Sequence, residues 1–160
     1  MKTPERATAV RKVNCAGEMC DFEVDTDKGA TYTAKALILG MGARRRKIGV
    51  PGEKEYDGKG VAYCSTCDAP LFSGKTVAVI GGGNAGLEAV VDLFPYAEKI
   101  YLLEFSGELK GDAVTQDEVR KHEKVEIIMN AETKEIFGEQ MVTGMKYKDR
   151  VSGEEQTLDV

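Results

Sequence analysis

Residues 76–86 read Thr-Val-Ala-Val-Ile-Gly-Gly-Gly-Asn-Ala-Gly, and this stretch gives the strongest indication of the fold. Its first five residues are too apolar to face water on either side, which predicts a buried strand of a parallel sheet. The next six residues have the spacing G-x-G-x-x-G directly after that strand. From residue 84 to residue 94 apolar side chains recur every three or four positions, and Pro95 follows. We therefore predict a helix that buries one face and ends before the proline.

The glycine-rich turn is typical of a site that binds a dinucleotide. Gly81 allows a tight turn, Gly83 lets the backbone approach a pyrophosphate, and Gly86 lets the helix pack closely on the strand. The start of the helix adds unpaired N–H groups and positive partial charge. The alternative is a glycine turn that only joins a strand to a helix. The predicted cofactor-binding residues of this turn are Gly81, Gly82, Gly83, Asn84, Ala85 and Gly86.

Glu104 follows the next predicted strand, residues 100–103, and lies 23 residues after Gly81. In a dinucleotide-binding fold an acidic residue at this place accepts hydrogen bonds from the adenosine ribose. A cofactor with a 2′-phosphate would need arginine or lysine instead, and residues 105–108 contain neither. The site therefore favours NADH over NADPH. The alternative is that Glu104 is an ordinary surface residue at the end of a strand.

The segments on either side extend this unit into an α/β fold. Residues 112–123 are expected to form a polar surface helix and residues 125–129 a third strand, which gives a right-handed parallel unit. Beyond Asn130 the pattern changes to strands separated by short turns, at residues 134–137, 142–148 and 157–160. We predict a Rossmann-like, three-layer dinucleotide-binding domain with an antiparallel meander.

The first 50 residues lack helical periodicity and are typical of short strands, including residues 21–24 and the apolar run 36–39. Residues 44–60 carry four glycines, one proline and mixed charge, which predicts a linker between two units. We place a β-rich segment with the linker at residues 1–52 and the nucleotide-binding domain at residues 53–160. The basic cluster Arg44, Arg45, Arg46 and Lys47 is interpreted as a solvated loop, with a polyanion-binding patch as the alternative.

Composition excludes several classes of protein. The 160 residues are 42% hydrophobic and 31% charged, which is the composition of a globular domain. A net charge of −5 disfavours nucleic acid as a partner. The longest uncharged run has 12 residues, whereas a membrane helix needs about 20 apolar residues. Residues 1–20 contain no apolar run of signal-peptide type, so we expect a cytoplasmic protein without a membrane partner.

Cys64 and Cys67 form a C-x-x-C motif, which can close a disulfide reversibly or supply half of a zinc site. Zinc would need two more ligands, for which Cys15 and Cys20 are candidates on the other unit; inert buried thiols are a further alternative. We interpret the motif as redox-active and predict no metal site. Asp68 is either a proton donor or a helix-start residue. The one histidine, His122, is expected to be exposed.

Several stretches resemble known enzymes. Residues 60–72, with Gly74-Lys75 and residues 79–86, resemble the pyridine-nucleotide domain of low-molecular-weight thioredoxin reductases. Residues 102–105 and 147–153 resemble more closely the flavoprotein subunit of alkyl hydroperoxide reductase, a relative that uses NADH. Upstream, residues 34–39, 42–44 and 49–53 resemble the strand and crossover that leave the flavin domain, with Gly40-Met41 where that family usually has Ala-Thr. The resemblance covers nearly the whole chain.

The resemblance implies the roles of the site residues. Cys67 would face a flavin, Cys64 would exchange with the protein substrate, and Asp68 would transfer a proton. Electrons would pass from NADH to FAD, then to the Cys64–Cys67 disulfide, and then to a thioredoxin-like or peroxiredoxin-system partner. We also expect a homodimer.

The chain departs from this family pattern in two places. It has no second glycine fingerprint near its start, and it ends before the segment that contacts the flavin. We therefore expect part of a longer enzyme, without FAD and inactive as an isolated chain. The alternatives are a non-catalytic NAD(H)-binding redox-sensor module and a zinc-stabilised interaction domain.

Overall fold

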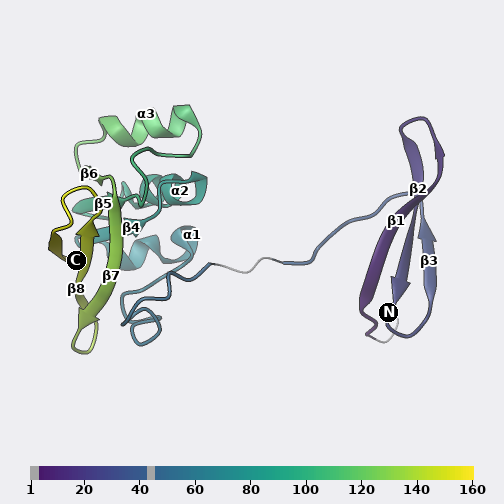
Figure 1. Ribbon diagram of the computed structural model, residues 1–160, viewed down its shortest axis with the longest axis horizontal. Coiled ribbons are helices and arrows are strands. Elements are labelled where there is room, and N and C mark those ends of the chain that lie inside the picture. Colours follow the sequence, from purple (N-terminus) through teal and green to yellow (C-terminus); the bar gives the residue numbers. More distant parts are fainter. Residues whose placement is uncertain (1–3, 43–45) are drawn as a thin grey trace. The chain divides into compact units, whose positions relative to one another are not determined.

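The computed structural model describes residues 4–42 and 46–160, and the chain divides into two compact units, Met1–Arg44 and Arg45–Val160 (Figure 1). The first unit contains the strands β1 (Ala7–Ala16), β2 (Met19–Thr26) and β3 (Thr31–Ala34). They form an antiparallel sheet in the order β1-β2-β3. The predicted strand at residues 21–24 is confirmed as part of β2.

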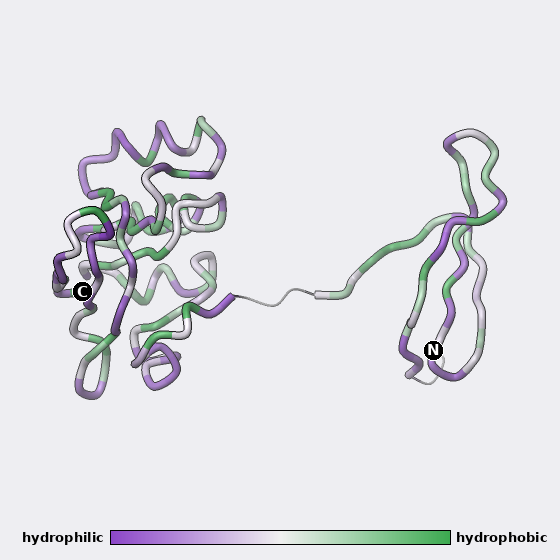
Figure 2. The backbone as a smooth tube through the Cα atoms, viewed as in Figure 1, coloured by the Kyte–Doolittle hydropathy of each residue, from purple (hydrophilic) through white to green (hydrophobic). Residues whose placement is uncertain are grey.

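The predicted strand at residues 36–39 is wrong. These residues have no regular structure, although Figure 2 shows them as a hydrophobic stretch after β3. Ile38 is 96% exposed and Leu39 is 61% exposed. A strand needs a neighbour that pairs with its backbone and covers its side chains, and no described part of the chain provides one here.

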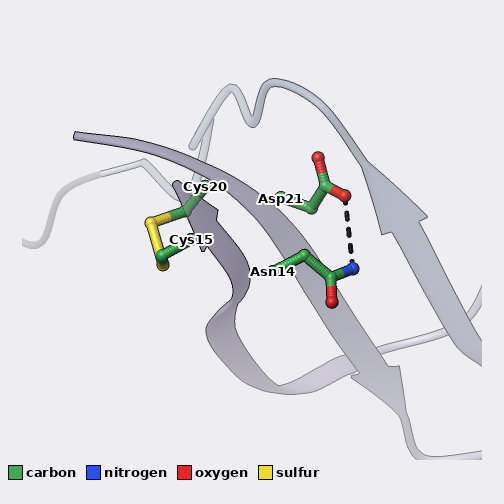
Figure 3. The surroundings of a disulfide bond; sticks show 4 residues. All are labelled: Asn14, Cys15, Cys20 and Asp21. Atoms are coloured by element: carbon green, nitrogen blue, oxygen red, sulfur yellow. Dashed lines mark hydrogen bonds between the residues drawn. A yellow bond between two sulfur atoms is a disulfide. The ribbon is translucent and has the colours of Figure 1, made fainter. Parts of the chain in front are cut away.

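A disulfide joins Cys15 to Cys20 at the end of the β1–β2 hairpin (Figure 3). Their Cα atoms lie 4.1 Å apart. On the neighbouring pair of residues, the Asn14 side-chain amide donates to the Asp21 carboxylate over 3.3 Å. The view of Cys15 and Cys20 as candidate zinc ligands is therefore wrong for this form of the protein, because bonded sulfurs offer no thiolate to a metal.

The second unit is built on a parallel sheet in the order β4-β5-β6, with helices between the strands as predicted. Helix α2 ends at Leu93, two residues before Pro95, and Asp112 caps the start of α3 by accepting from Thr115 N–H. The elements are β4 (Thr76–Ile80), α2 (Asn84–Leu93), β5 (Lys99–Leu103), α3 (Ala113–Lys121) and β6 (Val125–Ile128).

A second, antiparallel sheet gives this unit three layers. Its strands are β7 (Ala131–Gly138), β8 (Val142–Asp149) and β9 (Glu155–Asp159), which confirms the predicted meander. On one face of the parallel sheet, Leu102 packs with Leu87 and Val90 of α2. On the other face, Leu103 packs with Met145 and its neighbours in β7–β9. Successive residues of β5 therefore enter two different cores, as expected for a strand covered on both sides.

Strand β4 is less buried than predicted. It lies at one edge of the described parallel sheet, where β5 is its neighbour. Its first four residues are half-buried and Ile80 is exposed. The apolar sequence of residues 76–80 predicts that both faces of the strand are buried. Among the three described strands of this sheet, however, β4 lies at the edge and pairs with β5 only.

The stretch expected to be a linker packs instead against β7 and β8. The carbonyl of Pro51 accepts a hydrogen bond from Ile136 N–H in β7. Tyr56 is buried, and its hydroxyl donates to the carbonyl of Gly138 over 2.6 Å. In the basic cluster, Arg44 and Arg45 lie outside the described residues, and Lys47 pairs with Asp57 at 3.1 Å.

His122 is half-buried, so the prediction that it is exposed is wrong. Its ring stacks on Phe94 with 3.7 Å between centroids. The reason is tertiary: α3 ends at Lys121, and the following turn lies against the end of α2, where Lys124 Nζ donates to the carbonyls of Phe94 and Ala97. None of the helices in the described ranges is long and apolar enough to cross a membrane.

We predict that Tyr56→Phe lowers the free energy of unfolding of the second unit by about 1 kcal/mol, because Gly138 loses its hydrogen-bond donor while the ring remains. Tyr96→Phe is the matched control, since Tyr96 is 37% exposed. Urea unfolding of both variants gives the comparison. Equal unfolding energies for the two variants would show that residues 46–60 do not belong to the folded unit.

We also predict that non-reducing peptide mapping recovers Cys15 and Cys20 in one cross-linked species. The β1–β2 hairpin holds the two cysteines next to each other, so oxidation closes this pair. Cys15→Ser should make Cys20 reactive toward an alkylating agent in the denatured chain. Alkylation of both residues in the wild-type chain without a reductant contradicts the disulfide.

Candidate functional site

The glycine turn joins the end of β4 to the start of α2, and two of its glycines are required by geometry. Gly81 has φ of +104°, and its N–H donates to the carbonyl of Leu103 over 2.7 Å. A Cβ on Gly86 would lie 1.7 Å from the carbonyl oxygen of Gly81. Any side chain at residue 86 would therefore push α2 away from β4.

Gly83 marks the open side of the turn. It is the N-cap of α2, and a Cβ built on it meets no atom within 4 Å. The N–H groups of the first turn of a helix have no acceptor within the helix, so this open edge suits an anion. Ala85 is exposed at the same edge. The side chain of Asn84 is engaged elsewhere, because its Oδ1 accepts from Asp112 N–H over 2.8 Å.

Gly82 faces inward toward Glu104. A Cβ on Gly82 would lie 2.4 Å from Cδ2 of Leu109, so this position has no room for a side chain. The Gly82 N–H donates to Oε2 of Glu104 over 2.6 Å. Glu104 thus lies directly beside the glycine turn, as its spacing from Gly81 predicts.

The carboxylate of Glu104 is buried and well satisfied. The residue is 8% exposed, and its Oε1 accepts from Ser106 N–H at 2.8 Å and from Ser106 Oγ at 2.6 Å. The alternative of an ordinary surface residue is therefore wrong. Since a carboxylate oxygen can accept two hydrogen bonds, Oε2 retains one acceptor position beyond Gly82.

Burial tends to raise the pKa of Glu104, but the hydrogen bonds and a nearby charge outweigh it. Ser106 donates through its side chain and its backbone, Gly82 donates through its backbone, and Lys110 supplies a positive charge. Together they hold the pKa of Glu104 below its ordinary value. The group is therefore anionic at neutral pH and acts as an acceptor.

One basic residue lies near this acid and a second contacts the residue after it; neither was predicted from the sequence. Lys110 acts on Glu104 by its charge. Arg150, 45 residues after Phe105, places its guanidinium 3.9 Å from the centre of the Phe105 ring and donates from Nη1 to the Phe105 carbonyl at 3.0 Å. Residues 105–108 contain no basic residue, but the folded chain brings basic side chains from outside this stretch to Glu104 and Phe105. No local spacing signals this contact, because the turn between β8 and β9 brings Arg150 there.

The C-x-x-C motif forms a short helix, α1 (Ser65–Asp68), with Cys64 as its N-cap. The two sulfur atoms lie 2.8 Å apart, a contact rather than a bond of about 2.05 Å. Cys67 is exposed and Cys64 is half-buried. Asp68 closes the helix, and its N–H donates to the carbonyl of Cys64. The pair is close enough to form a disulfide, which remains a prediction.

Helix α2 connects the glycine turn to the C-x-x-C motif. Its first turn follows the glycines, and Asp92 near its other end accepts hydrogen bonds from Ser65 Oγ at 2.7 Å and Thr66 Oγ1 at 3.2 Å. Asp92 lies eight positions after Asn84 in the helix, a rise of about 12 Å. One helix therefore begins at the open glycine turn, here called the glycine cradle, and lies beside the dithiol near its other end.

The chain is similar to known proteins over most of its length. The family described as pyridine nucleotide-disulphide oxidoreductase matches residues 4–160. The chain is 49% identical over 139 residues to "NADH dehydrogenase" of Bacillus subtilis (strain 168), covering 87% of this chain and 27% of that protein. It is 47% identical over 157 residues to an alkyl hydroperoxide reductase subunit of Pseudomonas aeruginosa, covering 98% of this chain and 30% of that protein.

Solved structures give the same result. The thioredoxin reductase of T. acidophilum matches with a TM-score of 0.73 and 41% identity, covering 86% of this chain and 45% of that one. The enzyme of Giardia duodenalis matches with a TM-score of 0.80 and 30% identity, covering 97% and 49%. The chain thus spans less than a third of these curated relatives and about half of these structures. By its sequence and its fold, the chain belongs to the pyridine nucleotide-disulphide oxidoreductase family.

Proposed function

We propose that this chain is the nucleotide-binding and dithiol part of a flavin-dependent disulfide reductase that takes electrons from NADH. The observation that carries the proposal is the arrangement on α2, which begins at an open glycine cradle and binds the C-x-x-C helix through Asp92. Relatives named as thioredoxin reductases and as an alkyl hydroperoxide reductase subunit support it. The second unit serves as the nucleotide domain and the first as part of a flavin domain.

The residues of the cradle have distinct tasks in binding NADH. The N–H groups at the start of α2 and the open side of Gly83 hold the pyrophosphate. The remaining acceptor position on Oε2 of Glu104 receives a hydrogen bond from the adenosine ribose. Asn84 supports the cradle by holding Asp112 at the start of α3.

The dithiol completes the transfer by exchange. A Cys64 thiolate attacks one sulfur of the partner's disulfide, which forms a mixed disulfide and releases a partner thiolate. Cys67 then attacks Cys64, so that the Cys64–Cys67 disulfide forms and the partner leaves as a dithiol. Asp68 is positioned directly after Cys67 to move the accompanying proton. FAD, when bound in the complete enzyme, supplies the conversion between hydride transfer and disulfide reduction.

The proposal also covers the partner protein, the oligomeric state and the compartment of the enzyme. The partner is a thioredoxin-like or peroxiredoxin-system disulfide protein, and the active assembly is a homodimer in the cytoplasm, where NADH is supplied. The isolated chain carries no FAD and does not turn over. Gel filtration followed by flavin absorbance and sedimentation measurements tests these points.

We expect the chain to bind NADH more tightly than NADPH. A 2′-phosphate about 4 Å from the Glu104 carboxylate costs roughly 1–4 kcal/mol, which is at least several-fold in affinity. Calorimetric titration with both cofactors measures the difference. Glu104→Gln should narrow it, whereas Glu108→Gln, which removes an equal charge from an exposed residue of the same loop, should leave it unchanged.

The two basic residues make this test sharper. Tighter binding of NADPH by the wild-type chain, lost in Arg150→Met, would show that Arg150 receives the 2′-phosphate and would overturn the NADH assignment. A thermal melt of each variant shows whether the glycine turn survives, because Glu104 also accepts from Gly82.

We also expect that NADH alone does not reduce the Cys64–Cys67 disulfide. Hydride transfer needs an acceptor that takes two electrons, whereas a disulfide is opened by a nucleophile at sulfur. The chain is oxidised in a glutathione buffer, freed of flavin, and incubated with NADH while thiols are counted. Rapid loss of the disulfide under these conditions would contradict the mechanism. Failure of the pair to close at any glutathione ratio would favour inert thiols.

A further inference from the structure

Asp92 holds the two residues that lie between the cysteines. Its Oδ2 accepts from Ser65 Oγ at 2.7 Å and from Thr66 Oγ1 at 3.2 Å. Asp92 belongs to α2, far along the chain from the C-x-x-C motif, and it is half-buried. A single carboxylate oxygen therefore joins both intervening residues of the motif to the helix that follows the glycine turn.

Apolar packing does little to position α1. The helix has four residues, and none of them is buried. A cleft of about 300 Å³ lies between it and the end of α2, and the walls of the cleft include Ser65, Thr66 and Asp92. The first apolar anchor after the motif is Ala69, which is 3% exposed and belongs to the core of the unit. The motif is thus fixed by the core on its C-terminal side and by the Asp92 hydrogen bonds within it.

We propose that Asp92 is a positioning residue that keeps the Cys64 and Cys67 sulfurs within bonding distance. This inference rests on the proposed function, in which the two cysteines form a redox pair. Closing a disulfide is an intramolecular step, so its equilibrium depends on how closely the two sulfurs are held. The hydrogen bonds from Ser65 and Thr66 restrict the backbone between the cysteines to one helical turn, in which the sulfurs are 2.8 Å apart.

The test is the equilibrium with glutathione. One protein dithiol and one glutathione disulfide give one protein disulfide and two glutathione thiols, so the protein is oxidised while glutathione is reduced. Thiol counts on Cys64 and Cys67, resolved by peptide mapping, give the equilibrium constant. Asp92→Ala should lower that constant about three- to tenfold, because the motif becomes more mobile.

Two variants separate the hydrogen bonds from the charge. Asp92→Asn keeps an oxygen acceptor and removes the charge, so its constant should stay within about twofold of the wild type. Glu88→Ala removes a carboxylate from the exposed face of α2, one turn earlier, and should have no effect. An Asp92→Asn constant as low as that of Asp92→Ala would overturn positioning by hydrogen bonds.

A further variant guards against misfolding of α2. Ser65→Ala combined with Thr66→Val removes the same two hydrogen bonds from the other side and should reproduce the change seen in Asp92→Ala. A normal wild-type equilibrium that neither Asp92→Ala nor this double variant alters would refute the role of Asp92 and leave the proposed function intact. A wild-type pair that never closes would refute both.

Discussion

The hydrogen bond from Gly82 N–H to the Glu104 carboxylate, 2.6 Å long, is the interaction that joins the glycine turn after β4 to the end of β5. Parallel strands bring their carboxyl ends to one edge of the sheet, so the turn after β4 and the acid after β5 meet there. Glu104 satisfies an N–H that the tight turn leaves buried, and Gly81 donates to Leu103 beside it. With the turn closed, Gly86 packs on Gly81, and α2 begins at a place where anions can approach.

Helix α2 then links the glycine turn to the dithiol. Its buried residues Leu87, Val90 and Leu93 fix it against the sheet, which makes it a rigid support. The cradle lies at its start, and Asp92 binds the C-x-x-C helix near its end. Because about 12 Å of helix separates these points, the glycine turn and the C-x-x-C motif occupy two distinct places along α2.

The side chains around Glu104 and Phe105 come from separate parts of the chain. Ser106 belongs to the same loop, Lys110 follows a few residues later, and Arg150 comes from the β8–β9 turn. Hydrogen-bond donors and the charge of Lys110 keep Glu104 anionic. The guanidinium of Arg150 stacks on the Phe105 ring and donates a hydrogen bond to the Phe105 carbonyl. The surroundings of Glu104 and Phe105 therefore come from three segments of the chain.

Local sequence patterns were sufficient to predict the elements of the second unit and the residues of the glycine turn. Hydrophobic periodicity, Pro95 and the glycine spacing are local signals, and strands β4 to β9 and helices α2 and α3 follow them closely. The same holds for Glu104 and for the closeness of Cys64 and Cys67, since the spacing along regular elements sets their positions.

Contacts between distant segments, by contrast, arise only in the folded chain. Tyr56 reaches Gly138, His122 stacks on Phe94, and Arg150 covers Phe105. The glycine-rich stretch before Tyr56 resembles a linker locally, yet it is held by β7 and β8. Conversely, the apolar run at residues 36–39 has strand character but no neighbour to pair with among the described residues. Local propensity specifies which conformation a segment favours, whereas burial and hydrogen bonding depend on partners that only the folded chain brings together.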